Sequence, residues 1–249
     1  MYGAYNAVAT RQETIVYPAT GVRVEITDRG QKEAVNSVVC FIATWNPREG
    51  TYRWETSDPI FVPHRISGRG LSEPSIAELC DGRLFLVMRG STHAPTYERW
   101  HGVVESPGRK WTSTSQDGGH TWAPVTDLRY DTGEQFYSPA AFAKMLRHSR
   151  SGKLYWFGNI TPTPPDGNRP RYPLYLAEVD EAIPALKKDS LTVIDDRDPK
   201  RDPEAVQFSN FDVFEHPETG HFELYMTRYG ETPGNIWAAN AYRYTIEIL

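Results

Sequence analysis

The chain has 249 residues, with 27 basic and 32 acidic side chains and a formal net charge of −5. Hydrophobic residues make up 39% and charged residues 24%, which is typical of a globular protein and excludes a largely disordered chain. The negative charge argues against bulk electrostatic attraction, so we expect no nucleic-acid partner and no anionic membrane surface. An anionic ligand would need a local group of basic residues.

Targeting and metal-binding signals are missing from the sequence. No apolar run approaches the roughly 20 residues of a membrane span, and MYGAYNAVATRQET lacks the basic and apolar regions of a signal peptide. As written, the sequence predicts a cytoplasmic protein, or a periplasmic or secreted one if it lacks an N-terminal segment. The two cysteines and seven histidines have no metal-ligand spacing, so we expect no metal and no cofactor.

The first recognisable β segment is residues 37–55, SVVCFIATWNPREGTYRWE, which predicts two strands of an early sheet. Three later stretches, from Leu71, Tyr137 and Phe208, then repeat one pattern: a serine, a short apolar strand, a glycine turn and a second strand with a polar end. The turn glycines are 70 and 68 residues apart: Gly82, Gly152 and Gly220. A period of this length indicates a repeated supersecondary unit.

Each repeat continues into further β-like sequence, over residues 109–125, 171–195 and 237–249. Four strands in each unit is the blade of a β-propeller, so we expect an all-β fold in one domain over residues 1–249. The segment 180–189, DEAIPALKKD, contains a proline and is expected to form a loop or a single turn.

The repeat spacing fits roughly three and a half blades, whereas propellers close with about four to eight. Either the first 30 residues complete a four-bladed ring, or the chain is an incomplete set of about four blades from a six-bladed ring. We favour the second alternative, in which N-terminal blades are missing. An open stack of blades would leave strand edges exposed.

The segment Ser115–Trp122, SQDGGHTW, falls between the two outer strands of the first repeat. An aspartate followed by two glycines predicts a tight turn, since the carboxylate accepts backbone N–H groups and glycine allows unusual φ angles. The segment resembles the Asp box, or BNR repeat, of sialidases (neuraminidases), Ser-x-Asp-x-Gly-x-Thr-Trp. In that superfamily the box lies on the propeller rim, so the resemblance implies a structural role.

The repeat from Leu71, LSEPSIAELCDGRLFLVMRGS, is similar to a sialidase stretch in which a Glu opens one strand and an Arg ends the next. The resemblance implies that Glu73 polarises a nucleophilic tyrosine and that Arg89 belongs to a triad that clamps the substrate carboxylate. YSPAAFAKML resembles the start of a later inner strand and implies that Tyr137 is the nucleophile. The family's Arg-Ile-Pro motif and the following acid/base Asp are not in this sequence.

Further candidates come from position alone, because propeller ligands bind where innermost strands begin and end. Asn159, Asn210, Arg171 and Arg228 occupy such places and are predicted to contact substrate. A tyrosine of ordinary pKa, about 10, needs a neighbouring carboxylate to act as a nucleophile. Arginine suits the clamp because its fork binds a carboxylate through two hydrogen bonds.

The resemblance implies a glycoside hydrolase of the exo-α-sialidase-like type, acting on an acidic or decorated glycan. We expect the protein to be a monomer. Two alternatives stay open. The chain could be a non-catalytic propeller that binds carbohydrate or protein. It could also be a polysaccharide lyase on the same fold, which would need a Tyr/His pair or a metal near the axis. Fold alone does not decide between them.

Overall fold

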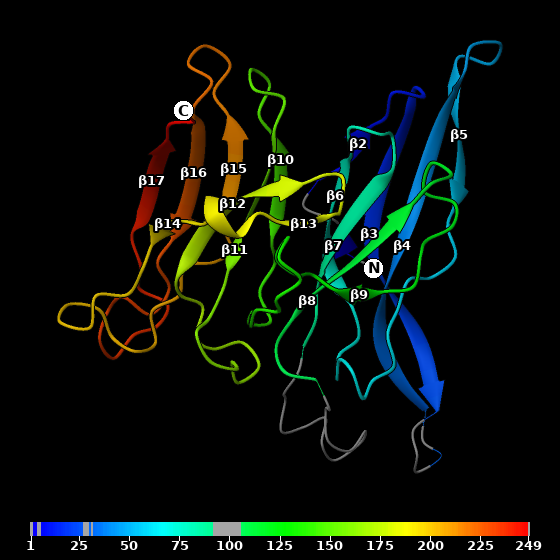
Figure 1. Ribbon diagram of the computed structural model, residues 1–249. Coiled ribbons are helices and arrows are strands. Elements are labelled where there is room, and N and C mark those ends of the chain that lie inside the picture. The colour runs from blue at the N-terminus through cyan, green and yellow to red at the C-terminus, as the bar shows by residue number, and fades with distance from the viewer. Residues whose placement is uncertain (1, 4–5, 27–29, 31, 92–105, 249) are drawn as a thin grey trace. The chain divides into compact units, whose positions relative to one another are not determined.

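Antiparallel β-sheets form nearly all of the regular secondary structure in this computed structural model, which describes residues 2–3, 6–26, 30, 32–91 and 106–248 (Figure 1). The helical structure in these residues is one 3-10 turn, η1 (Lys188–Ser190), and none of them forms a helix that is long and apolar enough to cross a membrane. The chain divides into a first unit, residues 1–128, and a second unit, residues 129–249.

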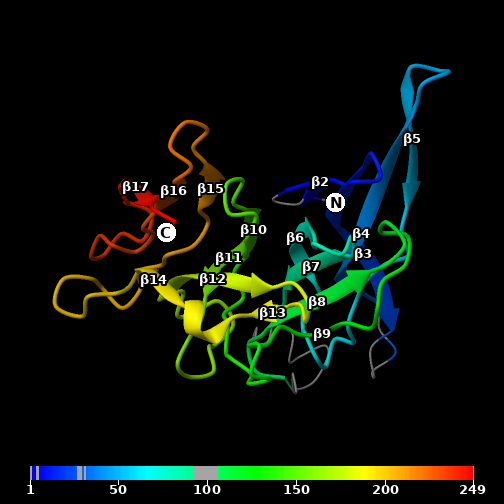
Figure 2. The same cartoon turned by 45° about the horizontal axis from the view of Figure 1, so that its top comes forward.

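The first unit contains two sheets. One has the order β1-β3-β4-β5, with β2 also paired to β3, and its strands are β1 (Tyr2–Gly3), β2 (Val8–Ala9), β3 (Thr14–Ile26), β4 (Lys32–Asn46) and β5 (Thr51–Thr56). The other sheet has the order β6-β7-β8-β9 (Figure 2) and contains β6 (Ser72–Glu78), β7 (Leu84–Arg89), β8 (Lys110–Ser115) and β9 (Thr126–Asp127).

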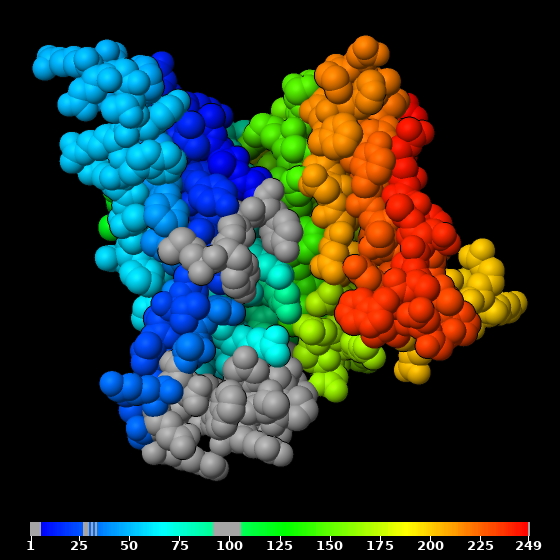
Figure 3. Space-filling view, turned by 180° about the vertical axis from the view of Figure 1, so that it is seen from behind, coloured from blue at the N-terminus to red at the C-terminus, as the bar shows by residue number. Residues whose placement is uncertain are grey.

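Alternation along the strands of the first unit places apolar side chains between its two sheets. Val16, Val38 and Ile42 of the first sheet belong to one buried cluster with Ile76 and Leu86 of the second. The edge strand β5 carries only exposed residues and lies at the surface of this unit (Figure 3). The core of the first unit is therefore a layer between two sheet faces, as in stacked blades.

The second unit also contains two sheets. The strands of one are β10 (Lys144–Arg147), β11 (Leu154–Asn159), β12 (Leu174–Asp180), β13 (Ala185–Leu186) and β14 (Thr192–Asp195). The order is β10-β11-β12-β13, and β14 also pairs with β12. The other sheet has the order β15-β16-β17 and contains β15 (Asp212–Glu215), β16 (Phe222–Thr227) and β17 (Ala241–Ile246).

Aromatic residues dominate the core of the second unit. Phe157 on β11 packs edge-on against Phe222 on β16, with ring centroids 5.5 Å apart. Phe142 and Phe211 lie 4.6 Å apart in the same buried cluster. Large rings bury much apolar surface for each residue, which suits the interface between two small sheets.

The predicted repeat is present in the structure. The three hairpins β6–β7, β10–β11 and β15–β16 correspond to the three stretches. Their turn glycines have φ angles in the left-handed region, 89° at Gly82, 72° at Gly152 and 76° at Gly220. A residue with a Cβ is strained at such angles, which explains why glycine recurs at this position.

Three details differ from the sequence prediction. Tyr137 is not the first residue of an inner strand, because β10 begins at Lys144 and Tyr137 forms only an isolated bridge to Thr161. The last sheet has three strands in the described residues instead of four. Within the first 30 residues the structure has β1, β2 and the long β3, which pairs with β4 along its whole length, whereas the first strands predicted from the sequence lie in residues 37–55. The segment 180–189 forms turns and the short β13, close to expectation.

The SQDGGHTW segment is a turn closed by its own side chains. Asp117 Oδ1 accepts the Thr121 N–H at 2.9 Å, and Asp117 Oδ2 accepts the Thr121 hydroxyl at 2.5 Å. Ser115 Oγ donates to the same carboxylate at 2.8 Å, and Trp122 Nε1 donates to the Gly119 carbonyl at 2.9 Å. Partial burial alone would raise the pKa of Asp117. The hydrogen bonds from Thr121 and Ser115 together outweigh this effect and lower the pKa to about 2.

Replacing Asp117 by alanine is expected to lower the free energy of unfolding by about 1 kcal/mol at pH 7, a modest value because solvent screens this exposed carboxylate. The folded-state pKa lies below the unfolded value of about 3.9, so the contribution is complete above about pH 4 and is lost as the pH falls through 2. Urea unfolding of the wild type and Asp117→Ala at pH 7 and at pH 2 measures the difference in unfolding free energy at each pH, with Gln116→Ala as the control. Equal stability of Asp117→Ala and wild type at pH 7 would contradict this account.

Candidate functional site

In the first unit, Glu73 and Arg89 form an ion pair at one end of the β6–β7 hairpin. Arg89 Nη1 donates to Glu73 Oε1 at 2.7 Å. The ladder pairs Ser72 with Arg89 and Ser75 with Val87, so β6 has one extra residue and bulges there. Glu73 has a φ of 48°, and its N–H donates to Thr20 Oγ1 at 3.0 Å. Non-glycine residues rarely adopt this conformation, and residues held in strained backbone conformations cluster at functional sites.

The carboxylate of Glu73 is only partly satisfied. The side chains of Glu73 and Arg89 are 17% and 15% exposed. Glu73 Oε2 is buried and accepts no hydrogen bond from the described residues. A buried carboxylate oxygen with an open acceptor position can receive the hydrogen of a ligand or side-chain hydroxyl.

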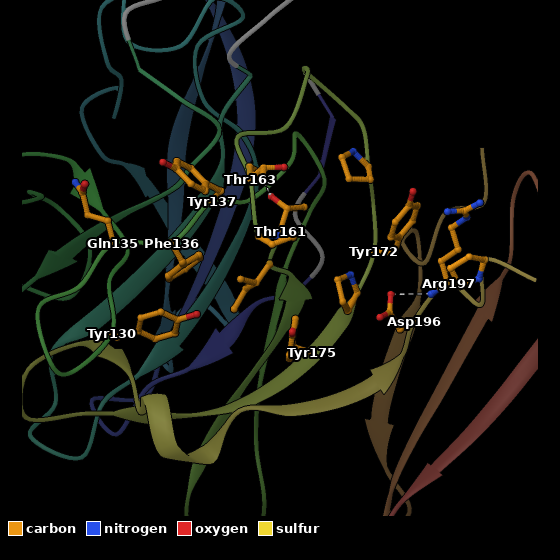
Figure 4. A pocket seen from close by; sticks show the side chains of 15 residues that line it. Tyr130, Gln135, Phe136, Tyr137, Thr161, Thr163, Tyr172, Tyr175, Asp196 and Arg197 are labelled. Atoms are coloured by element: carbon orange, nitrogen blue, oxygen red, sulfur yellow. Dashed lines mark hydrogen bonds between the residues drawn. The ribbon is translucent and has the colours of Figure 1, made fainter. Parts of the chain in front are cut away.

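In the second unit, Tyr137 lines a cavity of about 620 Å³ (Figure 4). The wall is mainly aromatic and proline side chains, with a few polar groups: Tyr130, Gln135, Phe136, Tyr137, Ile160, Thr161, Pro162, Thr163, Pro170, Tyr172, Pro173, Tyr175, Asp196, Arg197 and Pro199. This volume lies within the range of about 300–1,000 Å³ typical of small-molecule sites. Aromatic faces with interspersed hydroxyls suit a ligand that has both apolar and polar faces, such as a sugar.

Tyr137 is held through its backbone. Its carbonyl accepts the Thr161 N–H at 2.9 Å, and the next residue, Ser138, is buried and donates to the Asn159 carbonyl at 2.7 Å. These contacts fix the segment against β11 and leave the half-buried Tyr137 side chain at the cavity wall (Figure 4).

Two other tyrosines in the wall have raised pKa values. Burial, with smaller effects from Tyr175 and Glu134, raises the pKa of Tyr130 to about 12. Burial and the nearby Asp196 raise the pKa of Tyr175. Both phenols therefore stay protonated at neutral pH and can donate hydrogen bonds to a ligand.

Asn159 and Arg171 lie together, but inside the scaffold rather than at the cavity. The buried Asn159 amide donates to the carbonyls of Arg171, Pro173 and Phe208 at 3.2, 3.1 and 2.9 Å. The Arg171 side chain is also buried and donates to Ser209 Oγ at 3.0 Å and to the Ala140 carbonyl at 2.9 Å. Both residues, which the sequence predicts to contact substrate, thus connect strand ends and loops of the second unit.

Arg228 is enclosed by acidic and aromatic side chains. Its guanidinium lies 2.8 Å from Asp202 and 3.9 Å from Asp195, and it lies over the ring of Phe208 at 4.8 Å. Burial lowers the pKa of Arg228, but Asp195 and Asp202 raise it overall. Asn210 is exposed, with a φ of 58°, in the repeat position equivalent to Glu73. The structure therefore places neither Arg228 nor Asn210 in the cavity wall.

Sequence reasoning missed most of the cavity. Tyr172 and Tyr175 lie in RPRYPLY, from which the sequence predicts only Arg171 as a site residue. Asp196 and Arg197 lie in DDRDPKRDP, whose charges are typical of a surface loop. The available signal was the cluster of tyrosines and prolines beside the polar strand ends. Within the described residues, no group of three or more His, Cys, Asp or Glu side chains could hold a metal ion.

Comparison with known proteins gives a structural likeness only. No protein-family model matches the chain, and no curated protein matches it significantly. The NanB sialidase of Streptococcus pneumoniae matches 97% of this chain at a TM-score of 0.58 and 14% identity. A protein of unknown function from Dyadobacter fermentans matches 98% of this chain at a TM-score of 0.53 and 12% identity. The endo-1,5-α-L-arabinanase of Thermotoga petrophila matches 92% of this chain at a TM-score of 0.50 and 10% identity.

This chain spans 30%, 52% and 50% of the lengths of those three chains. At these identities the likeness defines the class of fold. In the residues that the structure describes, the protein is all-β with four antiparallel sheets, and its fold is similar to that of sialidase propellers.

The Glu73–Arg89 pair is expected to show a coupling energy of about 1–2 kcal/mol in a double-mutant cycle. A largely buried hydrogen bond between charged groups contributes more to stability than an exposed ion pair does. Arg53 and Glu55 on β5 are the control: they lie 3.2 Å apart, with side chains 76% and 44% exposed. That pair is expected to couple by about 0–0.5 kcal/mol. Urea unfolding of the single and double alanine variants gives both energies. A coupling of Glu73 to Arg89 no larger than that of the control pair would contradict a stabilising role for their buried hydrogen bond.

Proposed function

We propose that the protein is a sialidase-like glycoside hydrolase that acts on an acidic or otherwise decorated glycan. The observation that carries the proposal is the position of Tyr137 in the wall of a large aromatic cavity. The strained, partly satisfied Glu73 beside Arg89 adds a carboxylate and a guanidinium of the kind that this chemistry uses. The likeness of Ser115–Trp122 to an Asp box, together with the fold, supports the same class.

In the proposed reaction, the Tyr137 oxygen attacks the anomeric carbon and forms a glycosyl–tyrosine bond, while its proton passes to Glu73. The bond from the anomeric carbon to the leaving oxygen breaks, and that oxygen departs with the bonding electrons and takes a proton from solvent. Water then attacks the anomeric carbon and loses a proton to solvent, while the bond to the Tyr137 oxygen breaks and that oxygen regains its proton from Glu73. The two displacements give retention of configuration. Arg89 would bind the substrate carboxylate. The scheme requires the Tyr137 hydroxyl and the Glu73 carboxylate to come within about 2.6–3.2 Å of each other.

A second candidate function is carbohydrate binding without hydrolysis. The observation in its favour is the hydrogen bond that already joins Arg89 to Glu73, which leaves each group less available to a substrate. The two candidates predict the same ligand class and differ in turnover.

The test is hydrolysis of 4-methylumbelliferyl α-N-acetylneuraminide, whose phenolate departs with little help from an acid. Tyr137→Phe is expected to lower kcat by on the order of 10³-fold or more, because the nucleophilic oxygen is removed and much of the ring packing is retained. Glu73→Gln is expected to lower kcat as well, since the amide cannot take the proton. Tyr225→Phe, at an exposed tyrosine on β16, is the matched control and should retain full activity.

Thermal unfolding of each variant separates loss of chemistry from loss of fold. Wild-type turnover that survives in the folded Tyr137→Phe variant would contradict the assigned nucleophile. A wild-type protein that binds the sialoside without hydrolysing it would favour the second candidate.

A further inference from the structure

Arg197 is a cation that lines the cavity of the second unit. Its Nε donates to the backbone carbonyls of Asp202 and Pro203, both at 3.2 Å. Its guanidinium carbon lies 5.9 Å from the centre of the Tyr172 ring. Among the described residues, no carboxylate lies within ion-pair distance of this side chain, and Nη1 and Nη2 donate no hydrogen bond.

These contacts orient the guanidinium without neutralising it. The Nε–H is used by the loop backbone, so the edge formed by the two Nη atoms remains for another acceptor. Arg228, by contrast, is matched to Asp202 and Asp195. A guanidinium edge with two parallel donors binds a carboxylate or sulfate with better geometry than a single ammonium does.

Arg197 also lies away from Tyr137 within the cavity. In Figure 4 the two side chains are at opposite sides, and Thr161, Thr163 and Tyr172 lie between them. A cavity of about 620 Å³ has room for a ligand larger than one sugar ring. A group held by Arg197 would therefore belong to a different part of the glycan from the atom next to Tyr137.

We infer that this cavity binds a glycan of at least two sugars, stacked against Tyr172 and Tyr175, with an oxyanion of the sugar remote from Tyr137 held by the Nη edge of Arg197. The inference rests on the proposed function only in taking the ligand to be a glycan. The oxyanion is a carboxylate or a sulfate, which present the same pair of acceptor oxygens to the guanidinium.

Asp196 places a negative charge near this site and so lowers its affinity for an anion. It lines the same cavity, and its Oδ1 accepts the Arg197 backbone N–H at 2.7 Å. Its negative charge weakens the attraction of an anion but can accept sugar hydroxyls. Removal of that charge should therefore tighten binding of an anionic glycan and leave a neutral glycan little changed.

The experiment is calorimetric titration of the full chain with two matched pairs of probes: digalacturonate with its dimethyl ester, and lactose 3′-sulfate with lactose. We expect at least one anionic probe to bind more tightly than its neutral partner. Arg197→Gln should weaken that probe about 10-fold or more and bring it to the level of the neutral one. Asp196→Asn should tighten the anionic probe a few-fold.

Lys200→Gln is the matched control, because it removes one positive charge from the same loop at an exposed residue that does not line the cavity. It should leave all four affinities unchanged. The pair that responds to Arg197→Gln identifies the oxyanion as carboxylate or sulfate.

Two results would overturn the inference: no preference for either anionic probe, or equal weakening of the anionic probe by Arg197→Gln and Lys200→Gln. Binding does not depend on turnover, so the outcomes are separable from those of the sialoside assay. Arg197-dependent binding without sialoside hydrolysis would contradict sialidase activity and leave this site standing.

Discussion

The apolar layer between two sheet faces is the constraint on which each unit depends. In the first unit Val38 and Ile42 meet Ile76 and Leu86 across this layer, and in the second unit aromatic rings fill the same role. Because side chains alternate along a strand, a shift of one residue would move these groups out of the core. The packing thereby fixes the register of every inner strand, and with it the position of each polar residue at a strand end.

Polar residues at those strand ends have two kinds of role. Asn159 and Arg171 use their hydrogen-bonding groups on backbone carbonyls and Ser209, and so hold loops of the second unit in place. Tyr137 and Arg197 are fixed by contacts to backbone while their side chains line the cavity. Most buried polar groups in folded proteins are hydrogen-bonded, so some of the polar residues at these strand ends serve to hold the scaffold itself.

The repeat and its turns could be predicted from the sequence because they depend on local chemistry. A left-handed φ at Gly82 and the hydrogen bonds of Asp117 involve residues within a few positions of each other. The cavity could not be predicted, since it combines segments near residues 130, 137, 161, 172 and 197 that only the fold brings together. The same holds for Arg228, whose partner Asp202 lies 26 residues earlier. The structure reports the Glu73–Arg89 contact, whereas the role of each residue in catalysis is still a prediction.

In the proposed reaction, Tyr137 forms a covalent bond to a sugar. The most direct test is mass spectrometry of the protein after incubation with 2,3-difluoro-N-acetylneuraminic acid, in which the electron-withdrawing fluorine at C3 slows hydrolysis of a glycosyl–enzyme bond. We predict a mass increase of one fluorosialosyl group on the peptide that contains Tyr137, and none in Tyr137→Phe. An adduct on another residue would contradict the assigned nucleophile, and turnover of substrate with no adduct would contradict the covalent mechanism.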